Sequence, residues 1–346
     1  MDSIFFSVCI PNFNYGHLIT ETIQSVLDQD YSNFEIIVSD NCSSDDSEKV
    51  VLAIGDSRIK FFRNNFNIGF SPNLDKATIQ ANGDYLILLS SDDLMLPGAL
   101  RMYADNIAQQ KGSSQELVLM SSVTIIDENG IENGAKSAAT GDVLNYFKAN
   151  KNFDRTLPTN ILAGHEVLRA LISGTFQPAG QFLSTCYSRN LYHSVEGYNT
   201  PMSVYPDAFF SHKILMQNPK VIYVNRALFA YRVHGINNLA QIQTLNNIKS
   251  LTDNYVMSQS FPHSLLQTLN LSKQAPQLSF INNIILNPGW YSILRGHAVR
   301  GLRYLAFGYA SYPAMIIRRP RFYASVLLVP FTPILKLTYI FFKKFK

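Results

Sequence analysis

The stretches GDYLILLSSDD at residues 83–93 and FEIIVSD at residues 34–40 decide the fold of this chain. Each is an apolar run, too short for a buried helix, that stops at small polar residues and carboxylates. This pattern is typical of a strand covered on both faces. In an open parallel sheet such strands end at one common edge, where ligands bind. We therefore expect Asp40 and Asp92 to lie at the same edge.

These carboxylates have no Lys or Arg beside them in the sequence. Acidic side chains gathered at one edge repel each other unless a hard divalent cation joins them. The pattern thus predicts a bound metal ion that serves a phosphorylated ligand.

Strand and helix alternate along the first part of the chain. Strands are expected at 6–10, 34–40, 59–63, 85–89, 117–126, 183–187 and 221–223, and helices near 17–28 and 72–80, after Pro97 and after Asp207. This alternation predicts an α/β fold with a doubly wound, mostly parallel mixed sheet. The polar stretch at 133–160 is expected to be loop-rich and to hold an acceptor or specificity loop. Residues from about 240 to 300 are expected to be helical.

The composition is that of a globular chain with a large core, since 47% of the 346 residues are hydrophobic and 16% are charged. Cys9, Cys42 and Cys186 form no C-x-x-C pair, so neither a disulfide framework nor a structural zinc site is expected. The N-terminus lacks a basic region and a following cleavage site, so we expect no signal peptide.

Charge is segregated along the chain. All 25 acidic residues lie at or before Asp253, whereas eleven of the 29 lysines and arginines lie from Lys273 onward. A basic block of this kind usually faces nucleic acid or an anionic membrane. Because the block is rich in aliphatic and aromatic residues, we expect a membrane surface and no nucleic acid.

The apolar stretch at 322–342 has nearly the length of a membrane span, but Pro330, Pro333 and Lys336 interrupt it. We therefore favour in-plane association with the membrane, held by basic and aromatic residues, over a true span. A helical cap packed on the enzyme, or a dimer, is the third alternative. The oligomeric state is not predicted.

Taken in chain order, these features resemble the family 2 nucleotide-sugar glycosyltransferases of GT-A fold. The shared elements are Pro11-Asn12, Asp40, Asn67-x-Gly69 with Asn73, the segment from Gly83 to Asp93, Gly197-Tyr198 and Asp207. The resemblance covers residues 4–235. It implies an inverting transfer of a sugar from a nucleotide diphosphate sugar, with UDP as the expected nucleotide, to a glycan or lipid-linked glycan. The expected pathway is a bacterial surface polysaccharide such as O-antigen or capsule.

The resemblance assigns roles to three carboxylates. Asp40 would accept a hydrogen bond from the nucleotide base, and its alternative is a turn or capping aspartate. Asp92 and Asp93 correspond to the D-x-D element, where Mg²⁺ or Mn²⁺ bridges the sugar diphosphate, and their alternative is a solvated acidic turn. Asp207 would be the general base, and its alternative is a helix N-cap.

Two further side chains follow in an R-x-H element. The resemblance places Arg232 near the diphosphate and His234 near the metal, although a lone histidine is more often structural. Lys76 would contact phosphate or be a solvated helix lysine. The other donor-binding candidates are Pro11, Asn12, Asn67, Gly69, Asn73, Ser90 and Ser91.

The chain departs from the family pattern at two positions. Ser90 occupies the first D-x-D position, so the metal would rest chiefly on Asp92, and Asn41 stands where many relatives carry an acid. These departures favour an alternative, a catalytically impaired transferase-like protein that binds nucleotide or acts as a membrane scaffold. A nicotinamide-dependent dehydrogenase is disfavoured because residues 11–16 lack G-x-G-x-x-G. A nucleotidyltransferase is disfavoured because the same turn lacks a glycine-rich basic loop.

We expect three parts in the chain. Residues 1–236 would form the nucleotide-sugar-binding and catalytic domain, 237–300 a helical extension, and 301–346 a basic, hydrophobic tail that associates with the membrane. The expected location is the cytoplasm, peripheral on the cytosolic face of the cell membrane.

Overall fold

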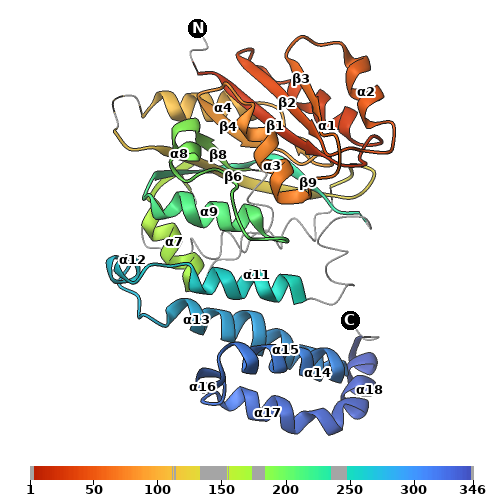
Figure 1. The fold of residues 1–346 in the computed structure, drawn as a ribbon, viewed down its shortest axis with the longest axis vertical. Helices are drawn as coiled ribbons and strands as arrows, with labels where there is room; N and C mark the ends of the chain where they lie inside the picture. Colours follow the sequence, from red (N-terminus) through yellow and green to blue (C-terminus); the bar gives the residue numbers. More distant parts are fainter. Residues whose placement is uncertain are drawn as a thin grey trace. The chain divides into compact units, whose positions relative to one another are not determined.

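The computed structural model divides into two compact units, which are described separately (Figure 1). The first unit comprises residues 1–168 and 176–245, and the second comprises 169–175 and 246–346. The structure describes residues 4–110, 112, 114–132, 154, 156–173, 184–234 and 248–343, with side chains described as far as residue 339. Most of the expected loop region at 133–160, and residues 235–247, lie outside this range.

One mixed sheet forms the centre of the first unit, in the order β3-β2-β1-β4-β8-β6-β9-β5, with β7 beside β9. Its strands are β1 (Phe6–Asn12), β2 (Phe34–Asp40), β3 (Ile59–Arg63), β4 (Tyr85–Leu88), β5 (Leu94–Met95), β6 (Leu117–Ile126), β7 (Thr159–Ala163), β8 (Cys186–Ser188) and β9 (Lys220–Arg232). Strands β3, β2, β1 and β4 run parallel, β6 and β9 are also parallel, and the other pairs are antiparallel. The expected mostly parallel mixed sheet is confirmed.

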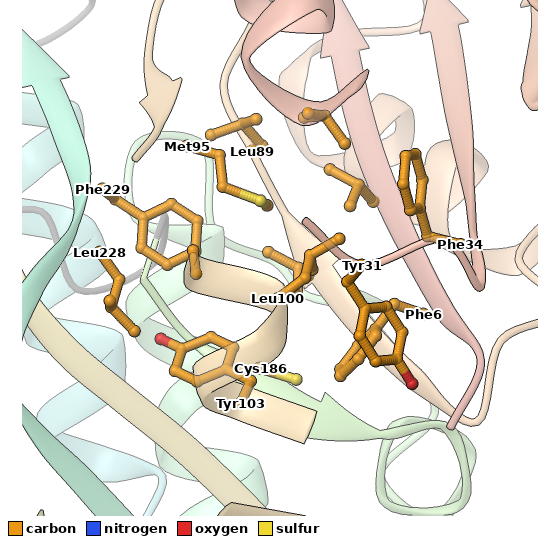
Figure 2. Packing of buried hydrophobic residues seen from close by; sticks show 14 of the residues in the cluster. Phe6, Tyr31, Phe34, Leu89, Met95, Leu100, Tyr103, Cys186, Leu228 and Phe229 are labelled. Carbon is orange, nitrogen blue, oxygen red and sulfur yellow. The ribbon is translucent and has the colours of Figure 1, made fainter. Parts of the chain in front are cut away.

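Helices cover both faces of this sheet, which is why β1 and β2 are buried along their whole length. The helices of this part of the chain are α1 (Ile19–Leu27), α2 (Ser47–Ile54), α3 (Phe70–Ile79), α4 (Ala99–Ala108), α7 (Gly164–Ile172), α8 (Arg189–Ser194) and α9 (Pro206–Met216). Helices α1, α2 and α4 pack on one face through Ile23, Val51 and Leu100, in the core shown in Figure 2. Helix α3 packs on β1 and β2 through the opposite face.

An aromatic cluster joins β8, α8 and α9. It consists of Tyr187, Tyr192, Tyr198 and Phe210, and the rings of Tyr198 and Phe210 stack with centroids 4.2 Å apart. Aromatic pairs of this geometry add to the stability gained from burial alone. The cluster therefore fixes the start of α9, which carries Asp207, relative to the sheet.

The strand register brings the polar strand ends to one edge. Asn12 lies opposite Asp40, and Cys9 lies opposite Leu88, so β1, β2 and β4 finish side by side. The strand order reverses between β1 and β4, which is where open α/β sheets bind ligands. Asp92 follows β4 by a short turn, and it therefore lies at the same edge as Asp40, as the strand pattern predicts.

Several elements differ from the sequence expectations. Strand β9 spans thirteen residues, because β6 pairs with it from Lys220 to Arg232, while β7 and β5 pair with parts of its first and second halves. These non-local pairings involve the short strands β5 and β7, which the sequence pattern did not indicate. The helix expected after Pro97 begins at Ala99, since Gly98 takes a left-handed φ of 81°.

The second unit is helical, as expected for the C-terminal region. Its elements are α11 (Ile248–Gln259), α12 (His263–Thr268), α13 (Ala275–Ser279), the π-helix η2 (Phe280–Leu286), α14 (Asn287–Leu294), α15 (Ala298–Ser311), α16 (Pro313–Ile316), α17 (Pro320–Leu328), η3 (Val329–Phe331) and α18 (Thr332–Lys343). A separate core lies between them, with Ile281, Ile285, Ile293 and Ile316 fully buried.

A left-handed turn at Glu196 and Gly197, with φ of 58° and 56°, leads toward α9. Asp75 on α3 holds this turn, since its Oδ1 accepts hydrogen bonds from the Tyr192 hydroxyl at 2.6 Å and the Tyr198 N–H at 2.9 Å. A Cβ at Gly197 would lie 2.5 Å from that oxygen. The turn therefore requires glycine both for its backbone angles and for the close approach of α3.

We predict that Gly197→Ala lowers the free energy of unfolding by about 2 to 4 kcal/mol, because it adds a steric clash to the strain of a left-handed residue. Urea denaturation would measure this. Gly55→Ala is the matched control, since Gly55 has a φ of 71° and nothing within 4 Å of its added Cβ. Equal losses in the two variants would show that the contact with Asp75 is unimportant.

Candidate active site

Asp40 lies at the end of β2 with no exposed surface. Its Oδ1 accepts hydrogen bonds from Asn12 Nδ2 at 2.8 Å and Ser43 Oγ at 2.5 Å, and its Oδ2 accepts one from the Ser43 N–H at 2.9 Å. The Arg63 guanidinium is 3.4 Å from Oδ2. These contacts are those of a turn aspartate, the alternative considered from the sequence. A contact between Asp40 and a nucleotide base stays a prediction.

The loops that follow β1 and β2 are joined by hydrogen bonds beyond the strand ends. The Asn14 N–H donates to Ser43 Oγ and the Ser44 N–H donates to Asn14 Oδ1, each at 2.8 Å. The Gly16 N–H donates to Asp45 Oδ2, also at 2.8 Å. This rim of the sheet is therefore fixed before any ligand binds.

Asn12 offers an unused acceptor at this rim. The residue is 1% exposed, and its Oδ1 is buried with no hydrogen-bond partner among the described residues. Its Nδ2 donates to Asp40, which sets the orientation of the amide. A buried acceptor without a partner is costly, and the N–H of a nucleotide base is one group that would satisfy it.

Asn41 organises the neighbouring loop. Its Nδ2 donates to Asn67 Oδ1 at 2.8 Å and to the Gly69 carbonyl at 3.2 Å, and its Oδ1 accepts from the Ile68 N–H at 2.9 Å. Asn73 is buried and bonded to Ser39 in both directions. The amides of Asn41 and Asn73 thus join β2 to α3 and to the loop between β3 and α3.

Asp92 and His234 lie together beyond β4 and β9. His234 Nε2 is 3.0 Å from Asp92 Oδ2, and both side chains are mostly buried. The ring of Tyr15 meets that of His234 edge to face, with centroids 5.8 Å apart. Burial and the charges of Asp92 and Asp93 raise the pKa of the Tyr15 phenol.

Asp93 and Arg232 form the support behind this pair. Asp93 Oδ1 accepts from the Arg232 N–H at 2.8 Å, and the Ser90 side chain also hydrogen-bonds to Asp93. Burial, together with the charge of Asp92, raises the pKa of Asp93. Arg232 Nε donates to the Asp92 carbonyl at 2.9 Å, and Nη2 pairs with Glu21 at 2.7 Å.

In the described part of the chain, Asp93 and Arg232 thus bind other protein groups, and Arg232 is 1% exposed. Their predicted contacts with metal and diphosphate stay predictions. Thr22 on α1 donates to the Ser91 carbonyl at 3.0 Å, which fixes the same turn from the other side. The sequence did not indicate Glu21 or Thr22, because their partners are distant in the chain.

Asp207 lies in the first turn of α9 and is half-buried. Burial raises its pKa to about 6, although the Ala208 N–H stabilises the carboxylate. Its side chain makes no N-cap hydrogen bond, since the N-cap residue is Tyr205. The charges of Asp93, Asp92 and Asp207 all raise the pKa of the Tyr231 phenol, after burial itself. One phenol therefore lies within electrostatic range of all three carboxylates.

The remaining candidates differ in position. Pro11 is buried within β1, opposite Ser39. Lys76 is exposed on α3 and has no ion pair among those found in the described residues. The sequence analysis did not name Arg63. It is the last residue of β3, and polar residues at strand ends are the pattern by which Asp40 and Asp92 were chosen.

The residues at this edge fit a divalent ion that takes some of its ligands from the protein and the others from a bound substrate. Among the described residues no group of three or more His, Cys, Asp and Glu side chains could hold a metal. However, Mg²⁺ is usually held by one or two carboxylates together with substrate phosphates. Asp92 with His234 supplies a donor set of that size.

Comparison with known proteins gives a family match over part of the chain. The sequence model described as Glycosyl transferase family 2 matches residues 7–170. A GalNAc(5)-diNAcBac-PP-undecaprenol beta-1,3-glucosyltransferase of Campylobacter jejuni is 43% identical over 97 residues, which cover 27% of this chain and 31% of that protein. The Escherichia coli enzyme WfgD, a UDP-Glc:alpha-D-GlcNAc-diphosphoundecaprenol beta-1,3-glucosyltransferase, is 37% identical over 102 residues, or 30% of this chain and 40% of the relative. The matches thus span less than half the length of these relatives.

Solved structures show the same fold. The crystal structure of Staphylococcus aureus TarS 1–349 has a TM-score of 0.61 at 15% identity, covering 97% of this chain and 91% of that one. The mannosyltransferase PcManGT of Pyrobaculum calidifontis, in complex with GDP-Man and Mn²⁺, has a TM-score of 0.53 at 14% identity, covering 97% and 88%. Residues 7–170 match the model of a glycosyl transferase family 2 domain, and the sheet has the GT-A fold.

Proposed function

We propose that this chain is an inverting glycosyltransferase that moves a sugar from a nucleotide diphosphate sugar to a hydroxyl of a glycan acceptor. The observation that carries this proposal is the position of Asp40 and of the Asp92–His234 pair at the edge where β1, β2 and β4 end, within a chain whose residues 7–170 match the Glycosyl transferase family 2 model. The raised pKa of Tyr231, to which Asp92, Asp93 and Asp207 all contribute, is consistent with one site for the diphosphate and for proton removal.

Asp207 would act as the general base in this reaction. It takes the proton of the acceptor hydroxyl while that oxygen bonds to the anomeric carbon, from the side opposite the diphosphate. The bond between the anomeric carbon and the diphosphate oxygen breaks, and the diphosphate keeps the electron pair. A carboxylate with a pKa of about 6 is a stronger proton acceptor than an ordinary aspartate, yet it is mostly ionised at pH 7.

Asp92 and His234 would hold a Mg²⁺ or Mn²⁺ ion against the diphosphate. A bound divalent ion neutralises negative charge that develops on the leaving diphosphate. Asp93 would serve this site indirectly, because it fixes the turn through the Arg232 N–H.

The names of relatives and neighbours support the choice of substrates. TarS has been solved in complex with UDP and with UDP-GlcNAc, and the two named enzymes above act on undecaprenol-linked acceptors. We therefore propose a UDP-sugar donor and a lipid-linked glycan acceptor in surface polysaccharide synthesis, such as that of O-antigen or capsule. The enzyme would work at the cytosolic face of the membrane, with residues 1–236 as the catalytic domain, 237–300 as a helical extension and 301–346 as the membrane-associating part.

Asn41 and Ser90, the two departures that favoured an impaired, scaffold-like protein, both make structural contacts in this chain. The Asn41 amide donates to two acceptors, Asn67 Oδ1 and the Gly69 carbonyl, which a carboxylate could not do. Ser90 hydrogen-bonds to Asp93 and helps to hold the turn before Asp92. Both departures from the family pattern therefore have structural roles in this chain.

Asp207→Asn is expected to lower kcat by about 10² to 10⁴, because the amide cannot accept the proton, while UDP binding remains. Released UDP would be measured with a panel of UDP-sugars and lipid-linked acceptors. Asp105→Asn is the matched control, since Asp105 is exposed on α4. Undiminished turnover in Asp207→Asn would remove this residue from the mechanism.

The pH dependence tests the same role in the unmodified protein. Protonation of Asp207 removes the base, so kcat/KM should fall as the pH drops below about 6 and reach a plateau above it. Thermal melting at each pH would show that the protein stays folded. A flat profile down to pH 5 would contradict the assignment.

Metal dependence is tested by binding. UDP with Mn²⁺ at about 100 times its Kd should raise the melting temperature by a few degrees, because a ligand of the folded state adds about 2.7 kcal/mol of stability. EDTA should remove most of this shift, as should Asp92→Asn. A UDP shift that EDTA leaves unchanged would argue against the metal.

Asn41→Asp is expected to raise the KM for the donor about tenfold with little change in kcat, since it loses two hydrogen bonds that hold the loop at 67–69. Steady-state kinetics would separate the two effects. Asn82→Asp, an exposed change at the opposite edge of the sheet, is the control. If Asn41→Asp kept the donor KM of the unmodified chain, the loop would not depend on this amide.

A further inference from the structure

Helices α17 and α18 of the second unit expose a row of large apolar side chains. The row consists of Tyr323, Val326, Leu327, Phe331, Ile334, Leu337 and Tyr339. Leu327 and Leu337 are each 70% exposed, and Ile334 is 62% exposed. Residues 320–339 are long and apolar enough to cross a membrane by length and composition, and only 11% of their apolar window is buried. A patch of this kind on a folded unit marks a contact surface.

The other side of the same segment is part of the protein core. Phe322, Leu328, Val329 and Leu335 pack against the buried residues of the second unit. Helices α17 and α18 both contact α14, and a Cβ at Gly296 would meet Lys336 of α18. The segment is therefore anchored along one side and exposed along the other.

This geometry does not suit a membrane span. Helix α17 has nine residues and α18 has twelve, or about 14 and 18 Å, whereas the hydrocarbon core is about 30 Å thick. The 3₁₀ turn η3, which contains Pro330, separates the two helices, and both pack on the eight-residue helix α14. A span would have to detach Phe322 and Leu335 from the core.

The positive charge around α17 and α18 favours an anionic bilayer over a second copy of the chain as the partner of the exposed side. No acidic residue follows Asp253, while Arg318, Arg319 and Arg321 lie at the start of α17 and the exposed Lys336 lies within α18. Two copies of this surface would bring like charges together. An anionic bilayer attracts each basic residue near its surface by about 1 kcal/mol, and tyrosines favour the headgroup region.

We propose that the segment from Pro320 to Tyr339 lies in the plane of an anionic lipid bilayer, with Leu327, Phe331, Ile334 and Leu337 inserted at the boundary of the acyl chains. We call this segment the membrane wedge. The inference rests on the proposed membrane location and assigns the residues that make the contact. It does not depend on which sugar is transferred.

Flotation of the full chain with vesicles tests the wedge. Binding should be strong to phosphatidylcholine vesicles that contain phosphatidylglycerol and weak to phosphatidylcholine alone. Leu327→Glu with Ile334→Glu should lower the partition coefficient at least about tenfold, because two inserted side chains are lost. Leu52→Glu with Ile79→Glu is the matched control, since these residues are 60% and 58% exposed in the first unit. Equal losses in the two pairs would overturn the proposal.

Two further measurements test the alternatives that the segment spans the membrane or binds a second copy of the chain. Alkaline carbonate should release the bound protein, and its retention would indicate a span and overturn the in-plane arrangement. Sedimentation without lipid should give the same mass for the wedge pair and the unmodified chain. If the unmodified chain is a dimer and the wedge pair is a monomer that still binds vesicles, the surface serves self-association and the proposal is overturned. The shift in melting temperature caused by UDP should be the same in the wedge pair, so failure of the wedge and failure of the transferase assignment are distinguishable.

Discussion

The hydrogen bond between Asn12 and Asp40 joins the ends of β1 and β2, and the arrangement of the site depends on it. A carboxylate with no exposed surface would be strongly destabilising without compensation. Asp40 is compensated by Asn12, by both polar groups of Ser43 and by the nearby Arg63. Because each partner comes from a different strand end or loop, satisfying this one charge fixes the relative positions of the segments that follow β1, β2 and β3.

The buried charge of Arg232 fixes the positions of the segments at the other half of the edge. Arg232 links the end of β9 to the turn at Asp92 and to Glu21 on α1. Arg232 is buried, and removing a partner from a buried charge is destabilising because the charge is then left uncompensated. The two halves of the site are thus held by charges that are internal to the protein, and the pair Asp92–His234 lies beside them.

The strands and the common edge could be predicted from the sequence, because β2 and β4 are short apolar runs with polar ends and this information is local. The carboxylates at the edge were found for the same reason. The partners of Asn41 and Arg232 could not be found, since residues such as Asn67 and Glu21 lie 26 and 211 positions away from them in the chain. Strands β5 and β7 were missed because they owe their structure to pairing with β9. The hydrogen bonds that Asn41 and Ser90 make in the structure could not be derived from the sequence either.

The two units differ in their charge, and this difference matches the roles proposed for them. Asp40 and Asp92 of the first unit lie at the edge where, under the proposed function, a divalent ion and a diphosphate would bind. From position 246 onward the second unit carries a single acidic residue, Asp253, so it has a large surplus of positive charge. A cationic surface with an exposed apolar row is stable in water but gains free energy at an anionic interface, where both the charges and the apolar side chains are satisfied. A lipid-linked acceptor is presented at that same interface, so the composition of the second unit and the proposed substrate of the first unit are physically consistent.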